Sequence, residues 1–455
     1  MRGLMKAVKK DEFFLILFSI SLLTRLIYLN VDSFWPDESI YLWVSQDFIH
    51  RFERVVEWSA YLPTLLIAVF PNHLWARFVI SLFSVSGVLF TYLLCKEILD
   101  ERYAFLTSLL LSASPVYWFI STRILLDTPL VAEVVGTAYF LLMHYRRKKE
   151  IYGMYAGIAA SAALLTKIAG LLAILLVFSY ALYRRRFYKW LLIPSLALAF
   201  VLVMNYSFFS GPLPHAPGEY MKGHIMTGDS FYYIRNLPFY ISIYLIPLFL
   251  LGLLFSALNL RRFHNLLTLS FLFTYLLFFS LLIGEKVPRY ALPSLPFMFV
   301  LCAYGASKLD FGINPFYIYL LFSIPALFSL SSDFLSLMNS KSQTYSGFPE
   351  AGTWLRQNMG RDAVLYAGSV RSMLAFTGLD ESRVRKLPEN LSELPRQENV
   401  FVEVDVWEYT QPSYVYPLDQ EKLDNLASLG FELVYYVQRE MNGQPVPVIF
   451  IFKHS

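Results

Sequence analysis

A small set of charged residues stands in strongly apolar surroundings, and these residues are the first candidates for chemistry. Three are carboxylates: Asp37 and Glu38, directly after Pro36, and Asp127. The others are the cations Arg25, Arg123, Lys167, Lys286 and Arg289. Ionisable groups at membrane depth are costly and usually functional. Lysine and arginine bind phosphate, and a carboxylate can remove a proton from an attacking hydroxyl. The set therefore suits chemistry on a phosphate-bearing lipid.

Each charge also has a purely structural explanation when it is taken alone. Arg123 and Asp127 are four residues apart, so on a helix they would share a face and pair. Lys167 could extend to the membrane interface, and the cations around Pro288 could be solvated loop residues. The acids after Pro36 could begin a helix. We favour a functional set because all of these charges fall on one predicted side of the membrane.

The elements that must position these residues are membrane helices. Of 455 residues, 56% are hydrophobic and 16% charged, whereas soluble domains carry about a quarter charged residues. Apolar runs near membrane length recur throughout. We predict a polytopic α-helical membrane protein with about eleven transmembrane helices. The predicted spans are 12–30, 74–95, 103–121, 128–145, 152–166, 168–183, 187–206, 239–260, 265–283, 290–308 and 315–332.

The distribution of positive charge predicts the orientation. Loops assigned to the cytoplasm are rich in lysine and arginine, as the positive-inside rule requires, if the N-terminus is cytoplasmic. The pattern persists only if Lys167 marks an outer turn between two short helices; one long tilted helix over 152–183 is the alternative. The basic segment 1–10 leads into an apolar run without a cleavage pattern, which predicts a retained first helix in a multi-pass cell-membrane protein.

Three segments are predicted outside the membrane. Residues 31–73 contain amphipathic stretches, such as 40–52, which are expected to lie along the membrane interface. Residues 207–238 are predicted to form a mobile loop. From residue 333 the composition becomes that of a soluble protein, with helix-like stretches at 349–358 and 418–429. Strand-like stretches alternate with them at 363–366, 400–404, 433–437 and 446–452. We therefore predict a membrane domain over 1–332 and a small extracytoplasmic α/β domain over 333–455.

A metal site is a weaker alternative. His215, Glu219, His224 and Asp229 lie in the second outer loop, but their spacing matches no tight ligand pattern. No cofactor is therefore predicted to be required, and a divalent metal stays an open possibility. The chain shows no phosphate-binding glycine motif, which argues against a soluble nucleotide substrate, and its net charge of +4 gives no support for nucleic acid.

Four short motifs carry a family resemblance. The sequence resembles the GT-C superfamily of membrane glycosyltransferases, and especially the branch of protein O-mannosyltransferases and the bacterial lipid A aminoarabinose transferase. The motifs are Pro36-Asp37-Glu38, Ser114-Pro115 followed by Thr122-Arg123-Ile124-Leu125-Leu126-Asp127-Thr128-Pro129, Leu165-Thr166-Lys167, and Lys286-Val287-Pro288-Arg289-Tyr290-Ala291-Leu292-Pro293. They occur in the family's order and on one predicted side.

The resemblance implies inverting transfer of a sugar from a polyprenyl- or dolichyl-phosphate donor on the outer face of the membrane. Asp37 would be the general base on the acceptor hydroxyl, and Glu38 and Asp127 would place the acceptor or the base. The donor phosphate would be held by Arg123, Lys167 and Arg289. Lesser contacts are implied for Arg25, Lys286 and Tyr290. The acceptor would be a protein, a glycan or a glycolipid.

Two other functions fit part of the pattern. A transporter or flippase for a lipid-linked or anionic substrate also needs intramembrane charges, but such proteins often show two related halves, and no such symmetry is visible in the sequence. Uptake or flipping without a new glycosidic bond would identify it. A noncatalytic scaffold that presents the C-terminal domain would leave the charges unexplained.

Overall fold

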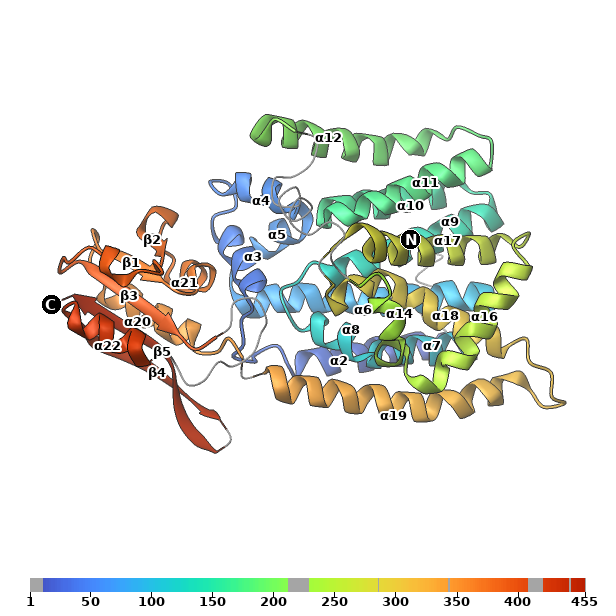
Figure 1. Ribbon diagram of the computed structural model, residues 1–455. Coiled ribbons are helices and arrows are strands. Elements are labelled where there is room, and N and C mark those ends of the chain that lie inside the picture. The colour runs from blue at the N-terminus through green and yellow to red at the C-terminus, as the bar shows by residue number, and fades with distance from the viewer. Residues whose placement is uncertain are drawn as a thin grey trace. The chain divides into compact units, whose positions relative to one another are not determined.

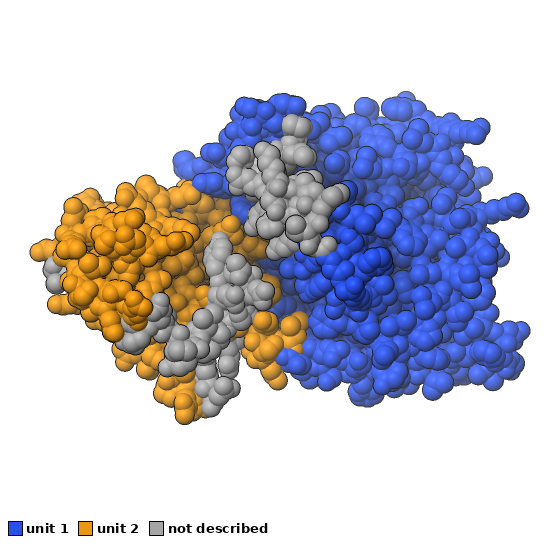
Figure 2. Space-filling view, in the orientation of Figure 1, with its two compact units in different colours: residues 1–29, 48–70, 74–336 blue, residues 30–47, 71–73, 337–455 orange. Residues whose placement is uncertain are grey.

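The computed structural model describes residues 11–211, 229–284, 286–342, 344–407, 420–441 and 443–454. The chain folds into two compact units, which Figure 2 colours separately. One contains residues 1–29, 48–70 and 74–336, and the other contains 30–47, 71–73 and 337–455. The second unit therefore combines the C-terminal domain with the short segment that carries Asp37 and Glu38. The basic segment 1–10 and residues 212–228 of the predicted outer loop lie outside the described residues.

The first unit is helical, and its long helices lie side by side (Figure 1). Its helices are α2 (Glu12–Leu26), α4 (Phe52–Trp58), α5 (Tyr61–Ile67), α6 (His73–Ile98), α7 (Glu101–Ala113), α8 (Pro115–Ser121), α9 (Asp127–Arg147), α10 (Glu150–Thr166), α11 (Leu171–Tyr183), α12 (Leu192–Phe209), α14 (Tyr232–Arg235), α15 (Leu237–Ile241), α16 (Ile246–Leu258), α17 (Phe263–Leu277), α18 (Leu295–Ala306) and α19 (Pro315–Lys341). Every predicted span overlaps at least one of them.

The prediction of a polytopic helical membrane protein is confirmed. In the described part of the chain, four helical stretches are long and apolar enough to cross a membrane: His73–Ile98, Lys189–Phe209, Phe263–Leu282 and Pro315–Lys341. Helices α7 and α8, bent by 66° at their junction, would form a fifth span if they cross together. The total of about eleven stays a prediction, because several other helices are shorter than about 20 residues.

Two short helices flank Lys167, as the charge pattern predicted. Helix α10 ends at Thr166, Lys167 is extended with φ −159° and ψ 144°, and a 3₁₀ turn over Ile168–Gly170 leads into α11. The turn is tight because Gly170 lies directly against the preceding helix. A Cβ atom at Gly170 would come within 2.0 Å of the Ala163 carbonyl group, so only glycine fits without a backbone shift.

The second unit contains a five-stranded sheet in the order β2-β1-β3-β5-β4. Its strands are β1 (Val364–Ala367), β2 (Val384–Lys386), β3 (Val400–Asp405), β4 (Phe431–Met441) and β5 (Gln444–His454). Strand β1 pairs in parallel with β2 and β3, whereas β5 runs antiparallel to β3 and β4. The four predicted strands correspond to β1, β3, β4 and β5. The predicted small C-terminal sheet is therefore present, with β2 as an additional strand.

Four helices accompany the sheet: α3 (Pro36–Gln46), α20 (Phe348–Asn358), α21 (Val370–Thr377) and α22 (Gln420–Ser428). Helix α21 was not predicted. It packs against α3, where Ser39 Oγ and Ser372 Oγ are 3.3 Å apart and Gln46 Nε2 donates to the Ala375 carbonyl at 2.8 Å. Residues 38–45 of α3 are buried. The expectation that 40–52 lies along the membrane interface does not fit α3, because this helix is covered by part of the C-terminal domain.

Candidate active site

Asp127 and Lys167 form the centre of the charged cluster in the first unit. Lys167 Nζ lies 2.7 Å from Asp127 Oδ1, although the two residues are 40 positions apart in the chain. The Asp127 side chain is 4% exposed and that of Lys167 is 21% exposed. Asp127 is the first residue of α9, where the helix dipole favours a negative charge. The pair therefore ties the start of α9 to the end of α10, and about a fifth of the Lys167 side chain stays exposed.

Arg289 and Tyr290 complete this cluster from a third part of the chain. Arg289 Nε lies 3.8 Å from Asp127 Oδ2, and the arginine side chain is 18% exposed. The Tyr290 ring lies 4.9 Å from Lys167 Nζ and 5.8 Å from Arg289 Cζ, within the range of cation–π attraction. Both residues belong to a 3₁₀ segment, Pro288–Ser294, that leads into α18. Three of the four sequence motifs thus contribute to one cluster.

Arg123 lies in the turn between α8 and α9 and is 1% exposed. Its guanidinium carbon is 5.0 Å from the centre of the Phe119 ring. Helix α9 begins only at Asp127, so Arg123 and Asp127 do not share a helical face. The intrahelical pairing considered from their spacing was therefore wrong, because the chain leaves α8 and turns before the next helix starts.

Arg25 is fully buried and is held by polar groups of its own and neighbouring helices. Its Nε donates to Ser84 Oγ at 3.2 Å, and its Nη1 donates to Ser112 Oγ at 2.8 Å and to Thr24 Oγ1 at 3.0 Å. Its Nη2 donates to the Ser112 carbonyl at 3.0 Å. A guanidinium has five N–H groups, so four of them are already used. These contacts connect α2 with α6 and α7.

Lys286 has a similar internal arrangement. Its Nζ donates to the carbonyl oxygens of Phe279 and Ser280, each at 2.8 Å, and to that of Ile283. These carbonyls lie in the π-helical turn over Phe278–Leu282, which follows α17, and at the residue directly after that turn. An ammonium has three N–H groups, so the three hydrogen bonds account for all of them. Lys286 therefore caps a helix end in this structure.

Asp37 and Glu38 lie in the first turn of α3, in the second unit. Glu38 is fully buried, whereas the side chain of Asp37 is 28% exposed. Arg371 Nη1, on α21, donates to Asp37 Oδ1 at 3.4 Å. The acidic motif is thus packed with a helix of the C-terminal domain, and sequence reasoning did not identify Arg371 as a partner.

Glu133 is a further carboxylate that the sequence reasoning missed. It lies within α9, is 6% exposed and accepts a hydrogen bond from Thr166 Oγ1 at 2.8 Å through Oε1. Its Oε2 has no hydrogen-bond partner among the described residues. Thr166 directly precedes Lys167, so the contact between Glu133 and Thr166 reinforces the pairing of α9 with α10. A carboxylate inside an apolar run was the signal that could have identified it.

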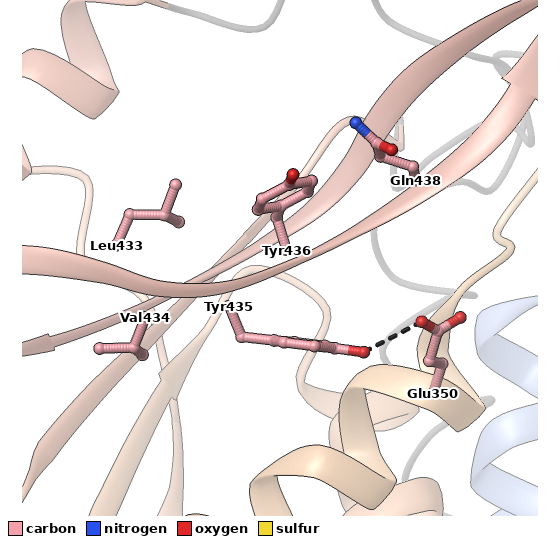
Figure 3. Close-up of a pocket in the computed structure, with 6 residues that line it drawn as sticks. All are labelled: Glu350, Leu433, Val434, Tyr435, Tyr436 and Gln438. Atoms are coloured by element: carbon pink, nitrogen blue, oxygen red, sulfur yellow. Dashed lines mark hydrogen bonds between the residues drawn. The ribbon is translucent and has the colours of Figure 1, made fainter.

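No group of three or more His, Cys, Asp or Glu residues in the described ranges is arranged to hold a metal ion. Of the loop residues considered as ligands, His215, Glu219 and His224 lie outside those ranges, and Asp229 Oδ2 is 2.8 Å from Arg235 Nη1. Figure 3 shows an open pocket of about 510 Å³ on β4 of the second unit. Tyr435 donates there to Glu350 Oε1 at 3.0 Å, and none of the sequence-predicted site residues lines the pocket.

Comparison with known proteins shows what the chain is similar to. The family model of dolichyl-phosphate-mannose-protein mannosyltransferases matches residues 55–210, which include Arg123, Asp127 and Lys167. None of the curated proteins matches the sequence significantly. The solved structures of ArnT and of an archaeal oligosaccharyltransferase have a similar fold, and together with the family model they confirm the resemblance to the GT-C superfamily.

ArnT from Cupriavidus metallidurans in the apo state is similar over nearly its whole length: the match covers 96% of this chain and 97% of that one, with 15% identity and a TM-score of 0.66. The same protein bound to undecaprenyl phosphate gives a TM-score of 0.65 at 15% identity, over 97% and 98% of the two chains. The oligosaccharyltransferase of Archaeoglobus fulgidus in the apo form matches with a TM-score of 0.55 and 15% identity over 87% of this chain and 70% of that chain. At these identities the structures show a common fold.

Proposed function

We propose that this protein is a membrane glycosyltransferase that transfers a sugar from a polyprenyl- or dolichyl-phosphate donor to an acceptor hydroxyl, with inversion at the anomeric carbon. The acceptor would be a protein, a glycan or a glycolipid. The observation that carries the proposal is the cluster of Asp127, Lys167 and Arg289, in which two partly accessible cations are held by one buried carboxylate. The match to a mannosyltransferase family and the ArnT structure with undecaprenyl phosphate support this donor class.

The reaction would be a single displacement. The acceptor hydroxyl attacks the anomeric carbon, the bond from that carbon to the phosphate oxygen breaks, and its electron pair leaves with the lipid phosphate. Asp37 takes the proton of the attacking hydroxyl. Lys167 and Arg289, with Arg123, bind the phosphate and stabilise the negative charge that develops on it. Because the leaving group is a stable anion, one carboxylate base is sufficient.

The remaining residues have supporting roles in this proposal. Asp127 orients Lys167 and Arg289, Tyr290 lies beneath both cations, and Glu38 places the acceptor or the base. Arg25 and Lys286 stabilise the helical bundle, because their N–H groups already bind oxygen atoms of the protein. The N-terminus would be cytoplasmic and the C-terminal domain extracytoplasmic, so that transfer occurs on the outer face.

A transfer assay tests the proposal. Purified protein in liposomes would receive polyprenyl-phosphate sugars of several kinds and a membrane extract as acceptor. Asp37→Asn should abolish sugar transfer and release of polyprenyl phosphate, whereas Asp362→Asn, at an exposed position of the same unit, should not. Full activity of Asp37→Asn would refute the role of Asp37. Movement of the labelled lipid across the bilayer without any new glycosidic bond would instead identify a transporter or flippase.

A further inference from the structure

The acidic motif makes a long-range contact with the C-terminal domain. Asp37 Oδ1 accepts a hydrogen bond from Arg371 Nη1 at 3.4 Å across 334 positions of the sequence. The two side chains are 28% and 26% exposed. An ion pair this accessible to solvent contributes little to stability. A guanidinium at hydrogen-bond distance also restricts where the carboxylate points.

The two helices that carry this pair are joined at further places. Beside the ion pair, Ser39 Oγ and Ser372 Oγ are 3.3 Å apart. At the other end of α3, Gln46 Nε2 donates to the Ala375 carbonyl at 2.8 Å. The first turn of α3 is thus fixed against the first turn of α21.

Helix α21 is itself anchored to the sheet and to α20. The Ser369 N–H group donates to Glu403 Oε2, on β3, at 3.2 Å. Arg356 Nη2, on α20, donates to the Phe376 carbonyl at 2.6 Å, and a Cβ added at Gly352 would come within 2.6 Å of the Phe376 backbone. Both ends of α21 are therefore constrained, and Arg371 projects from a rigid support.

We infer that Arg371 is a positioning residue for Asp37, and that the C-terminal domain serves to hold the catalytic carboxylate in its working orientation. This inference rests on the proposed function for the assignment of Asp37 as the base. A guanidinium is suited to the task because its planar N–H groups fix the orientation of a carboxylate. The C-terminal domain would then be a component of the catalytic apparatus.

The test compares Arg371→Ala, Arg371→Lys and a matched control, Arg385→Ala, at an exposed position on β2 of the same domain. Arg371→Ala should lower kcat by about 10- to 100-fold, the scale expected when a reacting group is displaced by about 1 Å. The KM for the lipid donor should stay within about twofold, because donor binding is not changed. Arg371→Lys should recover part of kcat, and the control should match the wild type.

Hydrogen exchange and thermal unfolding of the full-length protein provide a readout that does not need turnover. Arg371→Ala should speed exchange in the first turn of α3, residues 36–39, and leave both exchange in β3 and the melting temperature unchanged. The inference is overturned if kcat and exchange in α3 both stay at wild-type values. It is also overturned if the melting temperature falls and exchange rises throughout the domain, since Arg371 would then serve stability.

The two proposals can fail separately. If Asp37→Asn is inactive while Arg371→Ala is fully active with unchanged exchange in α3, only the positioning role fails. If Asp37→Asn is fully active, the assignment of Asp37 as the base fails. Faster hydrogen exchange in α3 of the Arg371→Ala variant would then show that the contact exists but has no catalytic role. That outcome also overturns the inference.

Discussion

The ammonium group of Lys167 is 2.7 Å from the carboxylate of Asp127. Lys167 directly precedes the 3₁₀ turn that leads into α11, and Asp127 is the first residue of α9, so the contact joins these two parts of the bundle. Asp127 is almost completely buried, whereas one fifth of the Lys167 side chain is accessible. The buried carboxylate therefore holds the ammonium of a side chain that is itself partly exposed. The proposed contact of Lys167 with the donor phosphate needs such a partly exposed cation.

Replacing Lys167 by methionine should damage both activity and stability. Loss of one charge-stabilising donor should lower kcat by about 100-fold. Removing the partner of a buried carboxylate should also lower the free energy of unfolding by about 1–3 kcal/mol. Lys308→Met is the matched control. Lys308 Nζ lies 4.8 Å from the centre of the Tyr304 ring, as Lys167 Nζ lies near the Tyr290 ring, but Lys308 is exposed. Transfer assays and melting temperatures in detergent would measure both effects.

The double variant Asp127→Asn, Lys167→Met separates the two contributions. It removes both charges, so it should be more stable than Lys167→Met alone while remaining inactive. Recovery of transfer in the double variant would show that Lys167 only neutralises Asp127. The proposed contact of Lys167 with the donor phosphate would then be wrong.

Arg25 and Lys286 should behave differently from Lys167, because their N–H groups are used by oxygen atoms of the protein. Arg25→Met leaves several buried oxygen atoms without a donor and should cost about 2 kcal/mol or more. Lys286→Met should destabilise the end of α17 to a smaller extent. In both variants the protein that remains folded should keep the wild-type KM for the lipid donor. Arg261→Met, at an exposed position, is the control. A stable variant with a strongly raised KM would instead place that residue at the donor.

The charged cluster could be predicted from the sequence because each member stands at the end of an apolar run, on the same predicted side of the membrane. Asp127, Lys167 and Arg289 come from three separate motifs, and the fold brings them together. Arg25 shows the same sequence signal but proved to be bonded within the bundle. The difference lies in partners such as Ser84 and Ser112, whose proximity to Arg25 depends on helix packing rather than on local sequence.

The contribution of the C-terminal domain could not be predicted from the sequence. An arginine in a stretch of ordinary soluble composition gives no signal, and Arg371 lies on a helix of only 8 residues. Its apolar pattern, between Gly368 and Gly378, is too short to indicate a helix by periodicity. The pairing of Asp37 with Arg371 depends on a contact between segments more than 300 positions apart, which only the fold can create.

Glu403 and Asp405 give the stability of the second unit a pH dependence. Burial, with a further contribution from Asp405, raises the pKa of Glu403 well above its ordinary value of 4.5, and burial also raises the pKa of Asp405. In the unfolded chain Glu403 loses its proton near the ordinary value, whereas the folded chain retains it. The unfolded state therefore binds fewer protons between the two pKa values, so stability falls as the pH rises through that interval.

Glu403→Gln should reduce this dependence, because an amide keeps an oxygen for the Ser369 N–H group and carries no charge to bury, whereas Asp405 still titrates. The variant should match the wild type near pH 5 and be more stable at about pH 8, with a melting temperature that changes less across this range. Glu393→Gln, at an exposed position, should follow the wild-type curve. Hydrogen exchange in residues 370–377 should slow in Glu403→Gln at the higher pH, because Glu403 anchors the start of the helix that carries Arg371. A variant less stable than the wild type at pH 8 would show that the ionised carboxylate is the stabilising form.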